Sequence, residues 1–214
     1  MAVLVALTLH DDAERWRTLG FSVQPDGVCQ VGTVRVEIGP TPHGSRAGLT
    51  SWAFEGTAEA DVVDGIPTHV APTGAPTTTL PHPADHQNGA TSLDHVVVTT
   101  PDLARTVAAF EAFGLAARRE RPTDAGGRPM RQVFFRPGEA IVELVGPPEP
   151  TGDGGARFFG LAFTVADLDA TAASLGDSLG RIKEAVQPGR RIATVRSDAG
   201  LGVPVAFMSG EPGG

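Results

Sequence analysis

The chain has 214 residues, 41% of them apolar and 20% charged, with a formal net charge of -8 at pH 7. This apolar share is typical of a packed globular protein of one large or two small domains. The acidic balance, without any run of basic residues, argues against binding to nucleic acid or to a membrane surface. Cys29 is the only cysteine, so an internal disulfide is excluded and a cysteine-based zinc site is disfavoured.

The first segment, MAVLVALTL, is apolar but lacks the basic flank and the cleavage site of a secretory signal. It is too short to cross a bilayer and continues into the polar residues HDDAERW. We therefore expect a first strand in a soluble, cytoplasmic protein. A helix in DDAERWRTLG should follow and end at Gly20, before short strands in FSVQ, VCQVG and VRVEIGP.

Two further apolar runs, GLTSWAFEG and GIPTHV, carry no helix signal between them. They read as an eroded copy of the same pattern. Residues 71–90 then differ in composition, with four prolines, four threonines and two glycines among few large apolar side chains. That composition predicts an irregular linker between an N-terminal part, 1–70, and a C-terminal part, 91–210.

The C-terminal part repeats itself, because TTPDLARTVAAF at 99–110 aligns with TVADLDATAASL at 164–175. Each segment follows an apolar run and precedes a glycine that can end a helix, Gly114 or Gly176. The spacing predicts helices over 102–113 and 167–175. Thr100 is the expected cap of the first helix, and Pro101 suits its first position.

Three strand-like runs follow each glycine. In the first copy these are LAARRER, RQVFFRPG and AIVELVGP, and in the second GRIKEAVQ, RRIATVRS and GVPVAFMSG. Each copy therefore reads strand, helix, strand, strand, strand, and the fold class is α+β. One such unit cannot bury both faces of its sheet, so the units should pair.

A tandem βαβββ unit with a histidine in its first strand and a glutamate in its last resembles the vicinal oxygen chelate superfamily. The motifs that carry the resemblance are LDHVVVTTPDL, at 93–103, and IVELVGP, at 141–147. Members include glyoxalase I, extradiol dioxygenases, methylmalonyl-CoA epimerase and the bleomycin-type resistance proteins. The resemblance implies a glyoxalase-like open cup over 91–210, with helices outside and ligand inside, preceded by a degenerate related half over 1–70.

The resemblance also implies that metal ligands project into the cup from the first and last strands of a unit, here His95 and Glu143. Strand alternation agrees, since His95 shares a face with Val97, and Glu143 shares one with Ile141 and Val145. Two ionisable groups among valines are costly to bury unless they are paired or bound to a metal. The alternative is a structural pair in which His95 and Glu143 hydrogen-bond each other.

The chain departs from the family where the second copy should supply ligands. Gly160 aligns with His95 and Ala206 with Glu143, and neither has a donor side chain. One histidine and one carboxylate fall short of the usual catalytic zinc or iron sets. The remaining ligands could come from a second chain, in a homodimer, or from other residues of this chain: His86, His82, His69 and Glu37.

The small residues at 160, 162 and 206 leave room for a ligand in the implied cup. A mostly apolar pocket with a few placed polar groups suits a small organic molecule. The candidate apolar walls are Trp52, Phe134, Phe163 and Met208. The candidates for holding a carboxylate or phenolate oxygen are Arg131, Arg191 and Arg196.

We expect a protein that binds a small oxygenated organic molecule. In the enzyme version, a divalent metal on His95, Glu143 and His86 acts as a Lewis acid, and Glu143 shuttles a proton. The activity would then be that of a lyase, isomerase or dioxygenase. The alternatives are a metal-free protein that sequesters its ligand, as resistance members do, and a degenerate member used for association.

Overall fold

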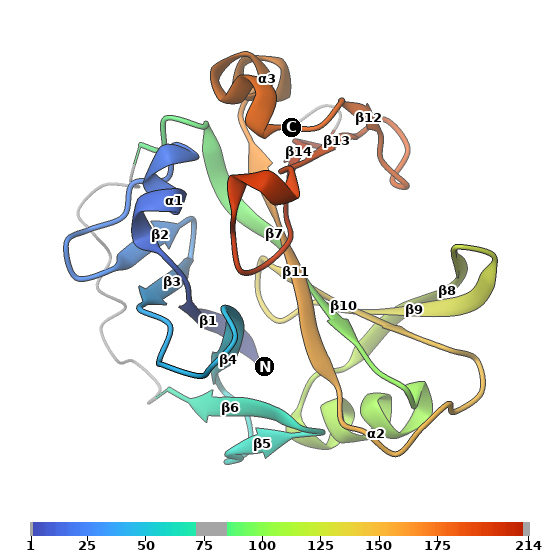
Figure 1. The fold of residues 1–214 in the computed structure, drawn as a ribbon. Coiled ribbons are helices and arrows are strands. Elements are labelled where there is room, and N and C mark those ends of the chain that lie inside the picture. The colour runs from blue at the N-terminus through green and yellow to red at the C-terminus, as the bar shows by residue number, and fades with distance from the viewer. Residues whose placement is uncertain (1, 72–84, 212–214) are drawn as a thin grey trace. The chain divides into compact units, whose positions relative to one another are not determined.

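The computed structural model describes residues 2–71 and 85–211 (Figure 1). The described residues form two compact units that interleave along the chain. The first unit holds residues 2–6, 50–71 and 95–160, and the second holds 7–49, 85–94 and 161–211. Four strands contribute residues to both units: β1 (Val3–His10), β4 (Gly48–Glu55), β7 (Ala90–Thr99) and β11 (Arg157–Val165).

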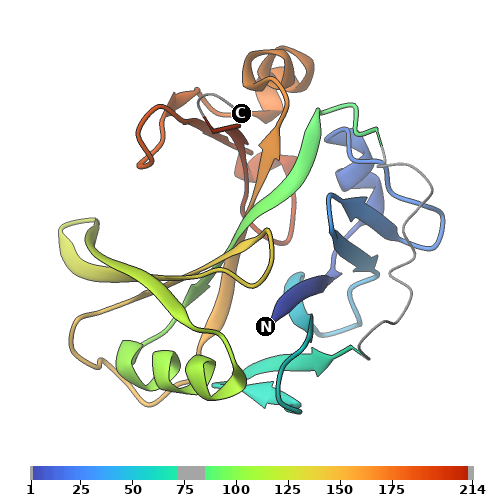
Figure 2. The ribbon, with the colours of Figure 1, turned by 180° about the vertical axis from the view of Figure 1, so that it is seen from behind.

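The first unit contains the first predicted βαβββ copy. Its strands follow the order β7-β10-β9-β8, with β8 at Ala117–Ala125, β9 at Arg128–Phe135 and β10 at Ile141–Gly146. β10 runs parallel to β7 and antiparallel to β9, while β8 and β9 form a long hairpin (Figure 2). Gly126 and Gly127 make the turn of this hairpin with φ angles of 61° and 82°, which favour glycine.

Helix α2 (Leu103–Phe113) connects β7 to β8 and begins one residue after its cap. The cap is Asp102, whose carboxylate accepts a hydrogen bond from Arg105 N at 3.0 Å. The prediction of Thr100 as the cap was wrong, because its hydroxyl accepts from Asp102 N and contacts the Thr106 hydroxyl at 2.6 Å. The helix ends at Gly114, which has a φ of 106°, as the sequence predicts.

The core of the first unit lies between α2, the β7–β10–β9 sheet and the strands β4, β5 (Val62–Val63) and β6 (Ile66–Val70). β4 and β6 are parallel neighbours, and no helix lies between them in the described chain, as expected for an eroded copy. Neighbouring rings make edge or tilted contacts with centroids 5.1–5.7 Å apart, and the rings are Trp52, Phe54, Phe110, Phe113, Phe135 and Phe158.

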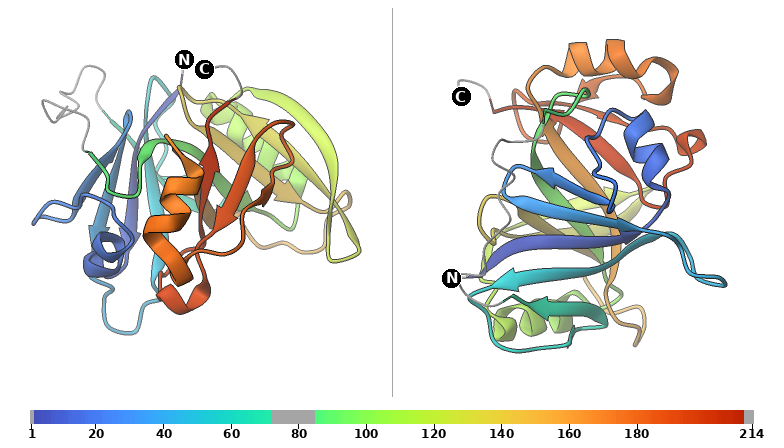
Figure 3. Two further views of the ribbon diagram at one scale, coloured as in Figure 1. Left: turned by 90° about the horizontal axis from the view of Figure 1, so that it is seen from above. Right: turned by 90° about the vertical axis from the view of Figure 1, so that its left-hand side faces the viewer.

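The second unit contains the second copy. Its strands follow the order β12-β13-β14-β11, with β12 at Lys183–Glu184, β13 at Arg191–Thr194 and β14 at Val205–Ser209. Helix α3 (Leu168–Leu175) packs along β13 and β14 (Figure 3). Its cap is Asp167, which accepts hydrogen bonds from Asp169 N and Ala170 N. Two short 3₁₀ turns follow, η1 (Gly176–Ser178) and η2 (Ser197–Ala199).

The N-terminal elements of the second unit are α1 (Ala13–Thr18), β2 (Val28–Val31) and β3 (Val34–Gly39). The strand predicted in FSVQ does not form. Phe21 N instead donates to Trp16 O, which closes the end of α1 and turns the Phe21 ring into the core. There it stacks with Phe207 and contacts Phe163 at a centroid distance of 5.0 Å.

The structure confirms the α+β class and the two βαβββ copies, with helices at the predicted positions. Residues 72–84 of the predicted linker, including His82, lie outside the described residues. The division into 1–70, 71–90 and 91–210 stays a prediction. None of the helices within residues 2–71 and 85–211 has the length and apolar composition needed to cross a membrane.

Candidate functional site

The first unit brings His95 and Glu143 together on one face of its sheet. β10 lies parallel to β7 with Ile141 opposite His95 and Glu143 opposite Val97, so these side chains project to the same side. The alternate residues of β10, Val142 and Leu144, are fully buried on the face that α2 covers. We call the side opposite α2 the His95–Glu143 face; the predicted parity of the two residues is confirmed.

The two side chains lie close to each other without a direct hydrogen bond. His95 Nε2 lies 4.0 Å from Glu143 Oε2, and the two side chains are 14% and 15% exposed. This distance is too long for a direct hydrogen bond. One oxygen atom at about 2.8 Å from each group would fit between them with an angle of about 90°. The geometry therefore suits a ligand hydroxyl or carbonyl held jointly by the imidazole and the carboxylate.

Glu143 is held in place by a polar row that crosses the sheet. Its Oε1 accepts a hydrogen bond from Gln132 Nε2 on β9, and Gln132 Oε1 accepts one from Arg121 Nε on β8 at 2.6 Å. Sequence reasoning missed Gln132 and Arg121. The signal that could have found them is register, since Arg121 stands opposite Gln132 in the hairpin.

Phe134 lies on the same face, because it stands opposite Glu143 in the β9–β10 ladder. Its ring is half-buried, and the Arg121 guanidinium carbon lies 5.1 Å from the ring centroid. This is the distance range of a cation–π contact. Of the four predicted apolar walls, Phe134 is the one that the structure places beside Glu143 within the described first unit.

The other predicted walls lie elsewhere. Trp52 is 1% exposed in the core of the first unit and donates from Nε1 to the Thr68 hydroxyl at 2.8 Å. Phe163 is fully buried in the core of the second unit, against Trp16. Met208 is also buried, opposite Thr164 on the sheet of the second unit. The alternation of apolar residues in the sequence does not distinguish a position in the protein core from a position that lines a ligand pocket.

The predicted arginines make protein contacts. Arg131 lies on the face opposite Gln132 and pairs with Glu120 at 2.7 Å. Arg191 forms a two-pronged ion pair with Asp169 on α3, which raises its pKa and lowers that of Asp169. Arg196 is exposed and donates weakly to Leu179 O at 3.4 Å. Arg131 therefore lies off the His95–Glu143 face of the first unit, and Arg191 and Arg196 belong to the second unit.

His86 is a buried residue of the second unit, 7% exposed. Its Nδ1 accepts a hydrogen bond from Ser22 N at 3.0 Å, and its Nε2 lies 3.0 Å from Gln30 O. This pairing favours the tautomer protonated on Nε2 and leaves no ring lone pair for a metal. Burial lowers the pKa of His86, which keeps the ring neutral. Its role as a metal ligand stays a prediction without structural support.

The residues present do not fit the divalent metal that the family resemblance implies. Among residues 2–71 and 85–211, no group of three or more histidine, cysteine, aspartate or glutamate side chains is placed to hold a metal ion. Glu37 pairs with Arg35 within β3, and His69 is exposed on β6. His95 and Glu143 supply two donors, whereas zinc and iron centres require at least three protein ligands.

A second polar cluster, which the sequence did not reveal, lies in the second unit. Arg190 forms an ion pair with Asp94, and their side chains are 6% and 7% exposed. Thr164 donates to Asp94 at 2.9 Å, and Arg190 Nε donates to Ser209 O at 2.8 Å. Hydrogen bonds within the protein therefore compensate the buried charges of Asp94 and Arg190, as expected for an ion pair with a structural role.

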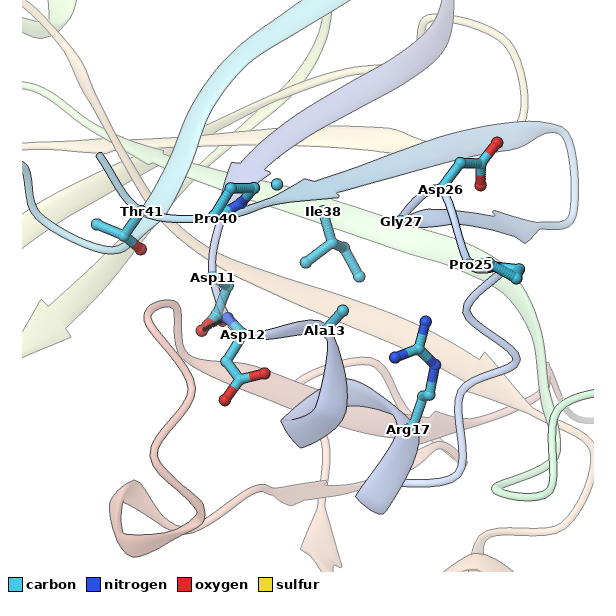
Figure 4. A pocket seen from close by; sticks show the side chains of 11 residues that line it. Asp11, Asp12, Ala13, Arg17, Pro25, Asp26, Gly27, Ile38, Pro40 and Thr41 are labelled. Carbon is cyan, nitrogen blue, oxygen red and sulfur yellow. Dashed lines mark hydrogen bonds between the residues drawn. The ribbon is translucent and has the colours of Figure 1, made fainter. Parts of the chain in front are cut away.

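A hollow of about 500 Å³ in the second unit lies around the start of α1, and its lining includes three aspartates beside Arg17 and apolar residues (Figure 4). These carboxylates already have structural roles. Asp11 accepts from Trp16 Nε1 and Gly202 N, Asp12 caps α1, and Asp26 accepts from Val28 N. The carboxylates at this hollow therefore stabilise the surrounding turns.

Comparison with known proteins identifies the family. Residues 92–198 match the model of the Glyoxalase/Bleomycin resistance protein/Dioxygenase superfamily. The chain belongs to this superfamily. The matched segment contains His95, Glu143, Gln132 and Arg121 and most of the second copy. No curated protein matches the chain.

Solved structures of this superfamily resemble the chain at low identity. A mutant of 4-hydroxymandelate synthase from Streptomyces coelicolor is 17% identical and covers 97% of this chain and 92% of its own, with a TM-score of 0.63. A xylose isomerase-like TIM barrel/4-hydroxyphenylpyruvate dioxygenase fusion protein is 14% identical and covers 99% and 49%, with a TM-score of 0.64. Methylmalonyl-CoA epimerase from Mycobacterium tuberculosis is 21% identical and covers 58% and 91%, with a TM-score of 0.46. The two longer matches show the fold.

Proposed function

We propose that this glyoxalase-like protein binds a small oxygenated organic molecule on the His95–Glu143 face without a metal ion. The observation that carries the proposal is the 4.0 Å separation between His95 Nε2 and Glu143 Oε2, which suits one shared ligand oxygen. The imidazole can donate to that oxygen while the carboxylate accepts its hydroxyl proton.

The surroundings of the pair support a binding role. The Glu143 carboxylate is fixed by Gln132, so it does not need to be ordered when the ligand arrives. Val97, Ile141 and Phe134 lie on the same face and offer apolar contact. A few placed polar groups among apolar side chains are typical of a small-molecule site.

A metal-dependent lyase, isomerase or dioxygenase is the competing function. It would need a third ligand, and the second copy has Gly160 and Ala206 at the aligned positions. Proton transfer by Glu143, a homodimer and a cytoplasmic location stay predictions from the sequence.

A fragment screen would test the proposal. Chelator-treated protein is screened by ligand-observed NMR with small hydroxyl and carbonyl compounds, and hits are titrated calorimetrically. We expect His95→Ala and Glu143→Gln each to weaken binding at least about tenfold, because each removes one of two hydrogen bonds to the ligand. Glu184→Gln, on an exposed strand of the second unit, is the matched control.

Two results would contradict the proposal. One is hits whose affinity is the same in both variants as in the wild type. The other is hits that bind only after a divalent metal is restored, which would favour the enzyme.

A further inference from the structure

The β8–β9 hairpin of the first unit has a charge opposite to that of the protein. Residues 115–136 contain six arginines and two acidic residues, an excess of four positive charges in a chain of net charge -8. Such a local reversal attracts anions to one region of an acidic surface. The hairpin borders the His95–Glu143 face, because β9 pairs with β10.

One of these arginines lies on the ligand-binding face itself. Arg121 is half-buried, its Nε donates to Gln132 Oε1 at 2.6 Å, and its guanidinium lies over the Phe134 ring. These two contacts fix the plane of the guanidinium. Within the described residues, its two terminal nitrogens make no hydrogen bond, so they remain for a ligand. A fixed guanidinium edge binds a carboxylate in a two-pronged geometry.

The polar row sets the spacing of the ligand groups. Glu143 and Arg121 project from β10 and β8, which are two strand spacings or about 10 Å apart at the backbone. Gln132 links the two side chains from the strand between them. Because both side chains reach toward Gln132, a ligand oxygen beside Glu143 and an anionic group at Arg121 would be less than about 10 Å apart, a span that one aromatic ring with two substituents covers.

We infer that the ligand is a hydroxylated carboxylic acid whose carboxylate binds Arg121 and whose hydroxyl binds between His95 and Glu143. This inference rests on the proposed function and adds the ligand class and the residue that selects it. Phe134, Val97 and Ile141 supply the apolar contact for the carbon skeleton. Arg121 is thus the specificity-determining residue for the anionic end.

Calorimetric titration with three probes tests the inference. The probes are 4-hydroxybenzoate, the neutral 4-hydroxybenzamide, and benzoate, which lacks the hydroxyl. We expect wild-type protein to bind 4-hydroxybenzoate at least about tenfold more tightly than the amide, because charge-assisted hydrogen bonds are the stronger ones. Benzoate should bind more weakly than 4-hydroxybenzoate, because it does not reach His95 and Glu143.

Variants of the hairpin separate a specific contact from a general charge effect. Arg121→Gln should reduce the affinity for 4-hydroxybenzoate to that for the amide, and Arg121→Lys should restore it in part, since lysine keeps the charge without the fork. Arg118→Gln removes the same charge from the same strand. Because Arg118 lines a separate hollow with Leu115 and Arg136, this variant should retain the preference for the acid. Thermal midpoints check that each variant is folded.

The outcomes distinguish this inference from the proposed function. If acid and amide bind equally, or if Arg121→Gln leaves their ratio unchanged, the ligand class is wrong while a site at His95 and Glu143 still stands. If Glu143→Gln leaves the binding of both probes unchanged, the proposed function itself fails. If wild-type protein binds none of the three probes, the hydroxylated-acid class is overturned, and the fragment screen alone decides whether the face binds ligands.

Discussion

The two βαβββ copies share their helix starts but not their polar side chains. Asp102 and Asp167 cap α2 and α3 in the same way, each with its carboxylate on the first-turn amides. The first copy carries His95 and Glu143 on its first and last strands in chain order, whereas the aligned residues of the second copy are Gly160 and Ala206. The residues that start the helices are thus present in both copies, whereas the residues of the proposed site are present in one.

The two units also differ in how the members of their buried polar pairs contact each other. Asp94 and Arg190 in the second unit contact each other and are completed by protein hydrogen bonds. His95 and Glu143 in the first unit lie 4.0 Å apart. A pair in direct contact stabilises the fold, whereas two side chains 4.0 Å apart, without a direct hydrogen bond, have the spacing that a shared ligand oxygen would need.

The largest expected effect is on the core. Trp52→Ala should lower the free energy of unfolding by about 3–5 kcal/mol, because it removes a fully buried ring and leaves a cavity. Phe134→Ala, on the half-buried face, should cost clearly less but weaken ligand binding. Urea unfolding of both variants measures the difference. Equal losses in the two variants would place Phe134 in the core as well.

The two polar pairs should respond differently to truncation. Arg190→Met removes the positive charge that pairs with the buried Asp94 carboxylate and should cost about 3 kcal/mol or more. His95→Ala should cost clearly less than Arg190→Met, because Glu143 keeps its bond to Gln132. Denaturant midpoints of the two variants provide the test. A loss of several kcal/mol in His95→Ala would instead make His95 and Glu143 a structural pair.

The two helix caps should contribute equally to the stability of the fold. Asp102→Ala and Asp167→Ala should each lower stability by about 1 kcal/mol, since each removes the acceptor for first-turn amides. The double variant should show the sum, because the caps belong to separate helices. Thermal unfolding of the three variants checks this, and a negligible effect at one cap would break the equivalence of the copies.

The smallest effect concerns pH. Burial lowers the pKa of His86 below its ordinary value of 6.5, so the unfolded chain takes up a proton more readily than the folded protein. The stabilisation is complete above pH 6.5 and is lost as the pH falls toward the lower folded pKa. Between pH 7.5 and 5.5 the wild type should therefore lose more stability than His86→Leu. Parallel pH profiles for the two proteins would show that His86 does not contribute.

The sequence predicted the elements whose signals are local. The two helices, their ends at glycine and the parity of His95 and Glu143 depend on residues within a few positions of each other. The cap of the first helix was nevertheless predicted wrongly, at Thr100 in place of Asp102. Trp52, Phe163 and Arg131 were assigned to a ligand site because alternation identifies two faces but not which one a distant segment covers. Gln132 and Arg121 required the register of the hairpin, which the sequence does not reveal.

Titration of Zn²⁺ and Mn²⁺ into chelator-treated protein, with and without His95→Ala, tests the central claim most directly. The claim is that His95 and Glu143 hold a ligand oxygen without a metal ion. It predicts no tight, stoichiometric uptake of either ion that disappears in His95→Ala, because two donors do not make a complete site. Uptake of one ion per chain in the wild type, abolished by His95→Ala and by Glu143→Gln, would contradict it.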